Sequence, residues 1–329
     1  MRVLVTGATG FVGAALLSRL SSDSIPCVAA VRRQGAMRFE GVTQVATGDI
    51  SPQTDWRQAL RGVDAVVHLA ARVHVMRDAA ADPLAEFRRV NVQGTLNLAR
   101  QAAAAGARRF VFLSSVKVNG EETLAPHPGP LPRGAREKER EKFSADDEPA
   151  PQDPYGISKM EAEAGLRDLA AQTGMEVVII RPPLVYGPGV KANFASMMRW
   201  LQRGVPLPLG AIHNQRSLVA LDNLVDLITV CLCHPAAANQ TFMASDGADL
   251  STAELIRRTA RAMNVPARLV PVPVWLLEAG AALLGKRDMA QRLCGNLQVD
   301  ISKTRQLLGW TPPMSVDDGL KKAVEGWRA

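Results

Sequence analysis

The N-terminal half of the chain alternates short apolar runs with stretches of helical spacing. Six runs rich in Val and Ile predict buried β-strands, at Val3–Thr6, Val28–Val31, Thr43–Ala46, Ala65–Leu69, Arg109–Leu113 and Val177–Ile180. Helical spacing occurs between them, over Val12–Leu20, Trp56–Leu60, Leu84–Ala105 and Ser158–Gln172. Buried strands that alternate with helices form a parallel sheet with helices on both faces. The sequence therefore predicts an α/β fold with a doubly wound parallel sheet.

A glycine-rich turn, Thr-Gly-Ala-Thr-Gly-Phe-Val-Gly over residues 6–13, joins the first predicted strand to the first helix. Gly7 permits a tight turn, Gly10 lets the backbone approach a diphosphate, and Gly13 allows close packing of helix on strand. The diphosphate would lie at the helix N-terminus, where N–H groups are free. The turn predicts a Rossmann-type dinucleotide site. Its other members are Thr9, Phe11 and Val12.

The end of the second predicted strand bears on the choice between NAD and NADP. A carboxylate commonly holds the adenosine ribose at this position. Here the chain reads Val31-Arg32-Arg33, and the Arg32 guanidinium is suited to a 2′-phosphate. The residues favour NADP(H), and NAD(H) stays open.

A tyrosine and a lysine share one face of a predicted helix. Asp153 is a typical N-cap, Tyr155 stands in the first turn, and Lys159 follows four residues later. A phenol has a pKa of about 10, and we expect the ammonium and the helix end to lower it. A strand that ends in Ser114-Ser115 precedes this pair, which predicts a Ser-Tyr-Lys catalytic group.

At this point the chain resembles the extended short-chain dehydrogenase/reductase family, and within it the sugar-nucleotide epimerases and dehydratases. The resemblance covers nearly the whole chain. Its motifs are residues 6–13 (TGATGFVG), 48–50 (GDI), 68–71 (HLAA), 91–95 (NVQGT), 114–115 (SS), 155–159 (YGISK), 181–189 (RPPLVYGPG), 216–224 (RSLVALDNL) and 301–310 (ISKTRQLLGW).

The resemblance implies roles for residues around the cofactor. Tyr155 would be the acid/base, Lys159 would activate it and hold the nicotinamide ribose, and Ser115 would hydrogen-bond the reacting sugar oxygen. Asp49 and Ile50 would flank the adenine. The remaining expected cofactor contacts are Leu69, Ala70, Ala71, Asn91, Pro182 and Pro183.

The resemblance also implies a UDP-sugar site. Asn193 and Phe194 match the segment that grips the nucleotide diphosphate, and Arg216 matches a phosphate-binding arginine. Arg292 is a second candidate of that kind. Lys117 stands near the sugar, where many epimerases carry a small hydroxyl residue.

Two reactions at C4 of the sugar fit these residues. A 4,6-dehydratase would need an Asp-Glu pair in place of Val116-Lys117, so we do not expect one. The family as a whole favours a 4-epimerase of a UDP-hexose or UDP-N-acetylhexosamine. Similarity to a subgroup of enzymes of bacterial surface polysaccharide synthesis, together with Arg32, favours an alternative reaction. This alternative is an NAD(P)H-dependent reductase of a UDP-4-keto-6-deoxy-N-acetylhexosamine. A non-catalytic dinucleotide sensor is a remote alternative, because it predicts a damaged Tyr or Lys.

A change of composition after Arg181 indicates a second lobe. Prolines and glycines cluster at 182–189, and helical spacing dominates afterwards. We expect a dinucleotide-binding domain at 1–183 with a return segment at about 215–235. A smaller, mostly helical C-terminal substrate-binding lobe would comprise 184–214 and 236–329. Residues 123–143 combine a Pro/Gly block with alternating charges, so we expect a flexible, exposed insertion.

Composition and net charge limit the classes of binding partner that we expect. The net charge is +7, but Lys and Arg are scattered and aromatics make up 5%, so anionic small molecules explain it better than nucleic acid. Four cysteines without paired ligand spacing predict neither disulfides nor a metal site. The apolar stretch 269–285 contains Pro271, Pro273 and Glu278 and is too short to span a membrane. We expect a cytoplasmic protein with Trp275 and Trp310 in its core, and the family resemblance implies that it can form a homodimer.

Overall fold

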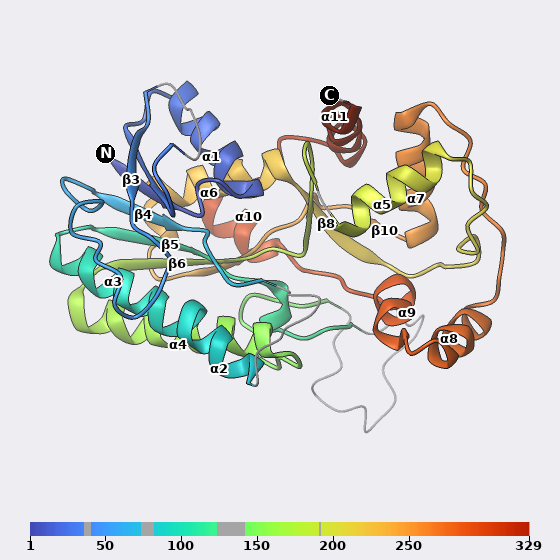
Figure 1. Cartoon of the computed structure of the whole chain (residues 1–329), viewed down its shortest axis with the longest axis horizontal. Helices are drawn as coiled ribbons and strands as arrows, with labels where there is room; N and C mark the ends of the chain where they lie inside the picture. Colours follow the sequence, from blue (N-terminus) through green and yellow to red (C-terminus); the bar gives the residue numbers. More distant parts are fainter. Residues whose placement is uncertain (36–40, 74–81, 124–141, 191, 329) are drawn as a thin grey trace.

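A seven-stranded parallel sheet forms the centre of the larger part of the protein (Figure 1). The structure is a computed structural model and describes residues 1–329 except 36–40, 74–81, 124–141, 191 and 329. The strand order is β3-β2-β1-β4-β5-β6-β9. The strands are β1 Val3–Thr6, β2 Cys27–Val31, β3 Thr43–Ala46, β4 Ala65–His68, β5 Arg109–Leu113, β6 Glu176–Arg181 and β9 Thr241–Met243. The predicted doubly wound fold is confirmed, and β9 is the one strand of this sheet that the sequence pattern did not predict.

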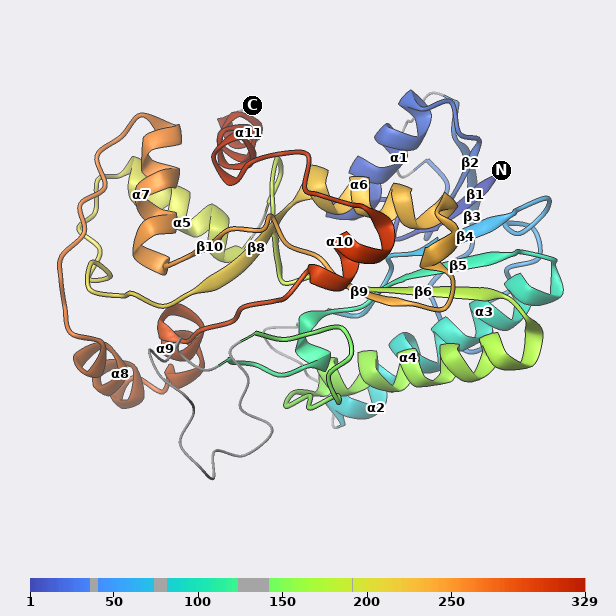
Figure 2. The ribbon, with the colours of Figure 1, turned by 180° about the vertical axis from the view of Figure 1, so that it is seen from behind.

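Helices cover both faces of the sheet, as Figures 1 and 2 show. Helices α1 (Phe11–Ser22) and α6 (Leu221–Cys233) pack on one face, and α3 (Thr95–Ala104) and α4 (Pro154–Thr173) on the other. Side chains alternate between the faces of a strand. Accordingly, Val3 and Val5 of β1 join the α1 side of the core, while Leu4 joins the α3 side. Burial on both faces explains why these strands are apolar throughout.

The structure departs from the prediction at two of the expected helices. The stretch expected as one helix over 84–105 consists of α2 (Pro83–Phe87), a π-helical segment η1 (Arg88–Gly94) and α3. Residues 56–60 form turns instead of a helix. There the Trp56 side chain is fully buried, and its backbone N–H donates to Gln101 Oε1 at 2.9 Å. A tertiary contact therefore overrides the short helical pattern.

The smaller part surrounds a second sheet, ordered β10-β8-β7. Its strands are β7 Leu184–Tyr186, β8 Arg216–Ala220 and β10 Asp249–Leu250. Helices α5 (Ala192–Gln202), α7 (Thr252–Met263) and α11 (Val316–Arg328) share a core with Tyr186. Two further helices, α8 (Val274–Leu283) and α9 (Arg287–Cys294), lie at the far end (Figure 1). This lobe is mostly helical, as expected, but it holds three short strands.

The chain crosses between the two parts more often than the sequence pattern indicates. Within the expected return segment, α6 packs on α1, whereas β8 pairs with β7 of the smaller sheet. Conversely, β9 pairs with β6 of the large sheet, and α10 (Ser302–Leu308) packs beside β9. Apolar patterning shows that a segment is buried, but it does not show against which sheet. The division into two functional lobes stays a proposal.

Both ends of the expected insertion are tied to the segment after α9. The Thr123 N–H donates to the Asn296 carbonyl at 3.0 Å, and the Phe143 N–H donates to that of Gln298 at 2.8 Å. Residues 124–141 lie outside the described residues, so the expectation of a flexible insertion stays untested.

The two tryptophans expected in the core have different surroundings. Trp310 is buried, and its Nε1 donates to Asp226 at 2.9 Å. Trp275 on α8 is 66% exposed, so the prediction for this residue is wrong. Within the described residues no helix is both long and apolar enough to cross a membrane.

Candidate active site

The glycine turn has the geometry that its sequence predicts. Gly7 has φ +67°, and a Cβ there would lie 2.8 Å from the Ala70 nitrogen. A Cβ on Gly13 would lie 2.1 Å from the Gly7 carbonyl oxygen, so any side chain would push α1 away from β1. Gly10 is the N-cap of α1, and because it has no side chain it does not cap the first N–H groups of the helix. The first N–H groups of α1 are thus available to an anion.

A cleft of about 630 Å³ opens beside this turn, along the carboxyl ends of β1, β2, β4 and β5. It gathers fourteen predicted cofactor or catalytic residues from segments that are distant in sequence. These are Gly7, Thr9, Gly10, Phe11, Val12, Gly13, Arg32, Asp49, Ile50, Leu69, Ala70, Ala71, Tyr155 and Lys159. Ligands of open α/β sheets bind at this edge.

Further lining residues were missed from the sequence. They are Thr6, Ala30, Val31, Thr47, Gly48, Trp56, Arg72, Val73, Val90, Leu113 and Ser114. Six of the eleven adjoin a predicted site residue in the sequence, and this adjacency is the signal that could have found them: Thr6, Val31, Gly48, Arg72, Val90 and Ser114.

Three predicted cofactor contacts do not line the cleft: Asn91, Pro182 and Pro183. Asn91 is buried, accepts from the Arg72 N–H at 2.8 Å, and donates to Ser158 Oγ on α4 at 3.0 Å. It therefore fixes the loop after Ala71 to α4. The Pro182 carbonyl accepts from the Val116 N–H at 3.0 Å and supports the turn after β5.

Helix α4 brings the predicted tyrosine and lysine together. Asp153 caps this helix by accepting from the Gly156 N–H at 2.7 Å, and Pro154 is its first residue. Lys159 Nζ donates to the Leu113 carbonyl of β5 at 2.7 Å. The same nitrogen lies 5.9 Å from the centre of the Tyr155 ring.

The electrostatics of this pair differ from the expectation. Burial lowers the pKa of Lys159 to about 7, against the negative charge of Glu163. Burial, together with the charge of Asp153, raises the pKa of Tyr155 above its ordinary value. The expected lowering of the Tyr155 pKa is not found, because burial and the charge of Asp153 both disfavour the phenolate.

A buried network around Glu163 holds the serine turn against α4. Glu163 accepts from Ser114 Oγ at 2.6 Å and from Arg181 Nε and Nη2 at 2.9 and 2.6 Å. All three side chains are buried. Next to Ser114, Ser115 Oγ accepts from the Lys117 N–H at 3.3 Å and caps a short 3₁₀ turn (η2, Val116–Val118). Sequence reasoning missed Glu163, although it follows Lys159 by four residues on the same helix face.

Charged side chains gather beyond Ser115, around Glu121. Lys117 Nζ forms ion pairs with Glu121 at 2.8 Å and with Asp153. Arg216 Nη1 donates to the Gly295 carbonyl at 3.0 Å, and burial lowers its pKa despite the charges of Glu122 and Glu121. The charge of Arg292 acts on Arg216 in the same direction as burial, so the structure brings the two predicted arginines near each other.

The other predicted substrate residues lie on α5. The Phe194 side chain is buried and stacks on Tyr186, with ring centres 5.9 Å apart. It belongs to the core of the smaller part, which leaves its backbone as the group that can meet a ligand. The side chain of Asn193 is not among those described.

Arg32 and Asp49 face each other in the cleft, just after β2 and β3. Arg32 Nη1 lies 3.9 Å from Asp49 Oδ1, and both side chains are exposed. A carboxylate is therefore present at this end after all, supplied by the segment after β3 and not by β2.

Residues 3–243 match the NAD dependent epimerase/dehydratase family. The chain belongs to this family. It is 48% identical over 326 residues to a UDP-glucose 4-epimerase of Vibrio cholerae, with 99% of this chain and 95% of the relative covered. It is 28% identical over 340 residues to N-acetyl-alpha-D-glucosaminyl-diphospho-ditrans,octacis-undecaprenol 4-epimerase of Escherichia coli O157:H7, covering 98% and 94% of the two chains.

Solved structures of epimerases share the fold. A UDP-glucuronic acid 4-epimerase from Bacillus cereus in complex with NAD superposes with a TM-score of 0.77 at 20% identity, covering 100% of this chain and 99% of that one. A UDP-glucose 4-epimerase from Thermotoga maritima with UDP-glucose gives 0.75 at 20% identity, with the same coverage. The family resemblance expected from the motifs is confirmed.

The cofactor of an NAD-dependent epimerase/dehydratase fits the residues present. The tight packing at Gly7 and Gly13 sets the N-terminus of α1 close against β1, and Gly10 at the N-cap has no side chain that would keep a diphosphate from the backbone. The N-terminus of α1 offers the matching N–H groups. Tyr155 and Lys159 line the same cleft, where they can meet the nicotinamide end.

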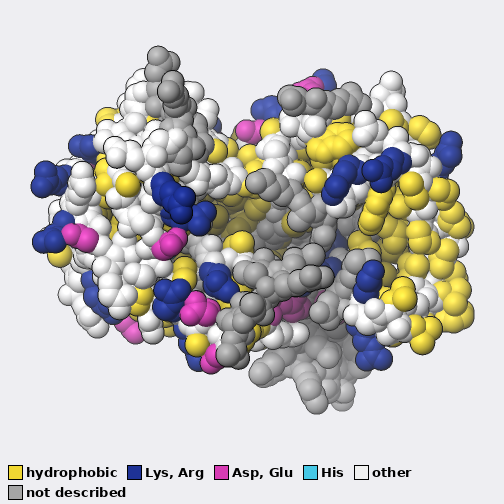
Figure 3. Space-filling model, in the orientation of Figure 1, with side chains coloured by type: hydrophobic (Ala, Val, Ile, Leu, Met, Phe, Trp, Pro, Cys, Tyr) yellow, Lys and Arg dark blue, Asp and Glu magenta, His cyan; other side chains and the backbone are white. Residues whose placement is uncertain are grey.

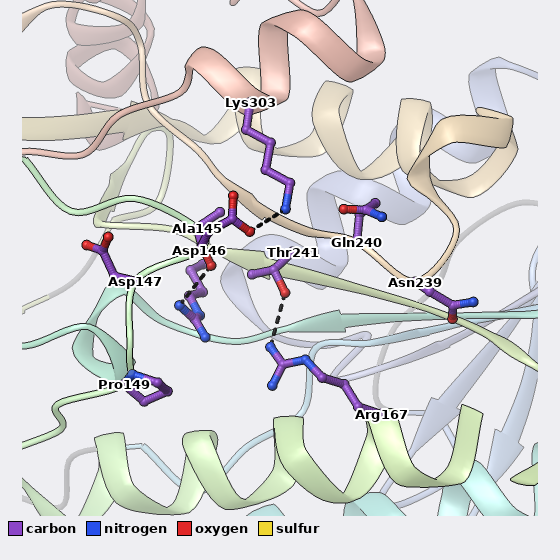
Figure 4. A pocket seen from close by; sticks show the side chains of 10 residues that line it. Ala145, Asp146, Asp147, Pro149, Arg167, Asn239, Gln240, Thr241 and Lys303 are labelled. Carbon is purple, nitrogen blue, oxygen red and sulfur yellow. Dashed lines mark hydrogen bonds and ion pairs between the residues drawn. The ribbon is translucent and has the colours of Figure 1, made fainter. Parts of the chain in front are cut away.

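A smaller cavity of about 310 Å³ lies apart from this cleft, between α4, β9 and α10 (Figure 4). Its charged side chains are engaged with neighbours. Lys303 pairs with Asp146 at 2.6 Å, and Arg167 donates to Thr241 Oγ1 at 3.1 Å. These pairs stabilise the edge of the sheet. We therefore place the candidate active site in the larger cleft.

Proposed function

We propose that the protein is a UDP-sugar 4-epimerase that acts on a UDP-hexose or UDP-N-acetylhexosamine. The observation that carries this proposal is the convergence of Tyr155, Lys159 and the end of β5 at one end of the cofactor cleft. The 48% identity to a UDP-glucose 4-epimerase along nearly the whole chain supports the reaction type.

In the proposed reaction the Tyr155 oxygen takes the proton of the C4 hydroxyl and later returns it. Bound NAD supplies the reversible oxidation at C4. Lys159 stabilises the phenolate electrostatically, and Ser115 Oγ donates to the sugar oxygen. The resulting 4-keto sugar must turn within the site before C4 is reduced on its other face. For this rotation the protein must bind the diphosphate while the sugar ring stays free to turn.

We propose that Arg216 and Arg292 bind the diphosphate, together with the segment at Asn193 and Phe194. Two neighbouring arginines can form charge-assisted hydrogen bonds to phosphate oxygens. Part burial strengthens such bonds, and Arg216 is already positioned by the Gly295 carbonyl. Lys117 is tied to Glu121 and Asp153, so we propose that it positions the residues around the sugar.

We propose NAD as the resident cofactor. The Arg32 charge, which favours NADP in the sequence, is partly offset by Asp49 at 3.9 Å. An epimerase also regenerates its cofactor in each turnover and has no need of a separate NADPH supply. We further propose that the protein works in the cytoplasm as a homodimer and has no nucleic-acid partner. Light scattering tests the dimer.

Incubation with UDP-glucose or UDP-N-acetylglucosamine without added cofactor tests the proposal. The expected product is the galacto-configured sugar nucleotide. Oxidation of added NADPH by a UDP-4-keto-6-deoxy-N-acetylhexosamine, with no epimerisation, would establish the alternative reductase. NAD binding with neither reaction would point to a dinucleotide sensor.

A further inference from the structure

Among the described residues, helix α8 packs against α9 and still leaves much of its apolar surface exposed. Its ten residues, Val274–Leu283, include one charged side chain, Glu278, and none of the ten is buried. Trp275 is 66% exposed, Leu283 is 89% exposed, and Leu284 just after the helix is 73% exposed. Contiguous apolar surface of this kind marks an interaction site.

The apolar surface continues into the segment before α8. We define the apolar patch as Val270, Trp275, Leu276, Leu283 and Leu284, all of which are exposed. Figure 3 shows hydrophobic side chains gathered along the edge of the molecule that this segment and α8 form. Figure 1 places α8 at the opposite end of the molecule from β3, well away from the adenosine end of the cofactor cleft. The patch is therefore not a continuation of that site.

Basic side chains border the apolar patch. Arg268 precedes it, and Lys286 and Arg287 follow α8 directly; all three are exposed. Residues 264–287 hold these three basic side chains and one acidic side chain, Glu278, a net charge of +2. Lys and Arg side chains lie at the border of the hydrophobic area in Figure 3. An apolar centre with a basic rim is complementary to a surface that is apolar inside and anionic outside.

Charge decides between the two simplest occupants. A second copy of the chain would bring the same patch across a two-fold axis, so two basic rims would meet and repel each other. An anionic lipid surface attracts the rim and accepts tryptophan and leucine at the headgroup boundary. Ten helical residues are about 15 Å long, which is enough to lie in the interface but not to cross a bilayer.

We infer that the apolar patch and its basic rim form a docking surface for an anionic membrane, with α8 lying in the plane of the interface. The inference does not depend on the proposed epimerase activity, because no residue of the patch lines the cofactor cleft.

Flotation of the full chain with lipid vesicles tests the inference. We expect binding to vesicles that contain phosphatidylglycerol, and binding at least tenfold weaker to pure phosphatidylcholine. High salt should weaken the binding, because the attraction of the rim is screened. Leu283→Ser combined with Leu284→Ser, and separately Lys286→Glu combined with Arg287→Glu, should each reduce binding at least tenfold. Leu307→Ser on α10, at a leucine 39% exposed, is the matched control and should bind as the wild type.

The variants alter exposed side chains, so melting temperature and turnover of soluble substrate should stay at wild-type values. A second readout is the blue shift of tryptophan emission on vesicle binding, which Trp275→Phe should reduce. Failure of the wild type to float with anionic vesicles, or unchanged flotation of the double leucine variant, would overturn the inference. A dimer that the double leucine variant converts to monomer, without vesicle binding, would show that a second copy covers the patch and would equally overturn it.

Discussion

The cofactor cleft and the proposed substrate site differ in the kind of group that forms them, backbone in the first and charged side chains in the second. The cofactor side is shaped by backbone, with a glycine turn so close-packed that a Cβ on Gly13 would lie 2.1 Å from a carbonyl oxygen. The charges that we propose for substrate binding form a separate cluster, which includes Lys117, Glu121 and Arg216 and is not part of the lining of this cleft. Cofactor binding should therefore depend on shape, and substrate binding on charge. Tyr155 and Lys159 line the cofactor cleft.

Removal of the Tyr155 hydroxyl should have the largest effect, because both halves of the reaction depend on its proton. We expect Tyr155→Phe to lower turnover about 10³-fold, in the range known for lost acid–base groups. Steady-state kinetics with UDP-glucose measure the loss. Retained NAD and an unchanged melting temperature would show that the fold is intact. Turnover within tenfold of the wild type would remove Tyr155 from the mechanism.

The shape of the cofactor side can be tested at Gly13. Gly13→Ala forces the N-terminus of α1 away from β1, at a cost of about 1–3 kcal/mol, so we expect NAD to bind about 100-fold more weakly. Titration calorimetry with NAD gives the affinity. Gly280→Ala is the control, since a Cβ there meets nothing within 4 Å. Equal affinity in both variants would contradict a diphosphate held against this turn.

The charge of the substrate side can be tested at Arg216. Arg216→Ala removes a charge-assisted hydrogen bond to phosphate, so KM for the UDP-sugar should rise at least about tenfold while NAD affinity stays unchanged. Arg199→Ala, an exposed arginine on α5, serves as control. An unchanged KM in Arg216→Ala would show that other residues bind the diphosphate.

Burial of Lys159 predicts a smaller effect, on stability. Because its pKa falls to about 7 in the folded protein, the unfolded chain binds one more proton than the native state above that pH, up to the ordinary pKa of lysine. The free energy of unfolding should therefore rise with pH in this window, by at most about 1.4 kcal/mol per pH unit. Lys159→Met should flatten this dependence in urea titrations at pH 7 and 9. Parallel curves for variant and wild type would contradict the lowered pKa.

The backbone-shaped side was largely predictable from sequence. Its turn at Gly7–Gly13 is determined by neighbouring residues, whereas Asp49 and Ala70 were expected from the family resemblance; the structure places all of them in one cleft. The Tyr155–Lys159 pair was predicted from helical spacing together with the preceding strand that ends in Ser114-Ser115. Local geometry and the family motifs were sufficient for these residues.

The rest depends on contacts between distant segments. Glu163, Arg181 and Ser114 meet only after α4 packs on the sheet, and burial in that interior raises the Tyr155 pKa against expectation. The exposure of Trp275 has the same origin, since an apolar helix is predicted to be buried, and only the fold shows that packing against α9 leaves much of α8 exposed. Sequence patterns give the chemistry of a side chain, but its partners come from the assembled fold.

Proton NMR of UDP-glucose incubated with the protein in D₂O, without added cofactor, tests the central claim most directly. The account predicts UDP-galactose that keeps its original hydrogen at C4, because that hydrogen leaves and returns within the site while Tyr155 handles only the hydroxyl proton. Deuterium at C4 of the product, or no product from a protein that retains NAD, would contradict it.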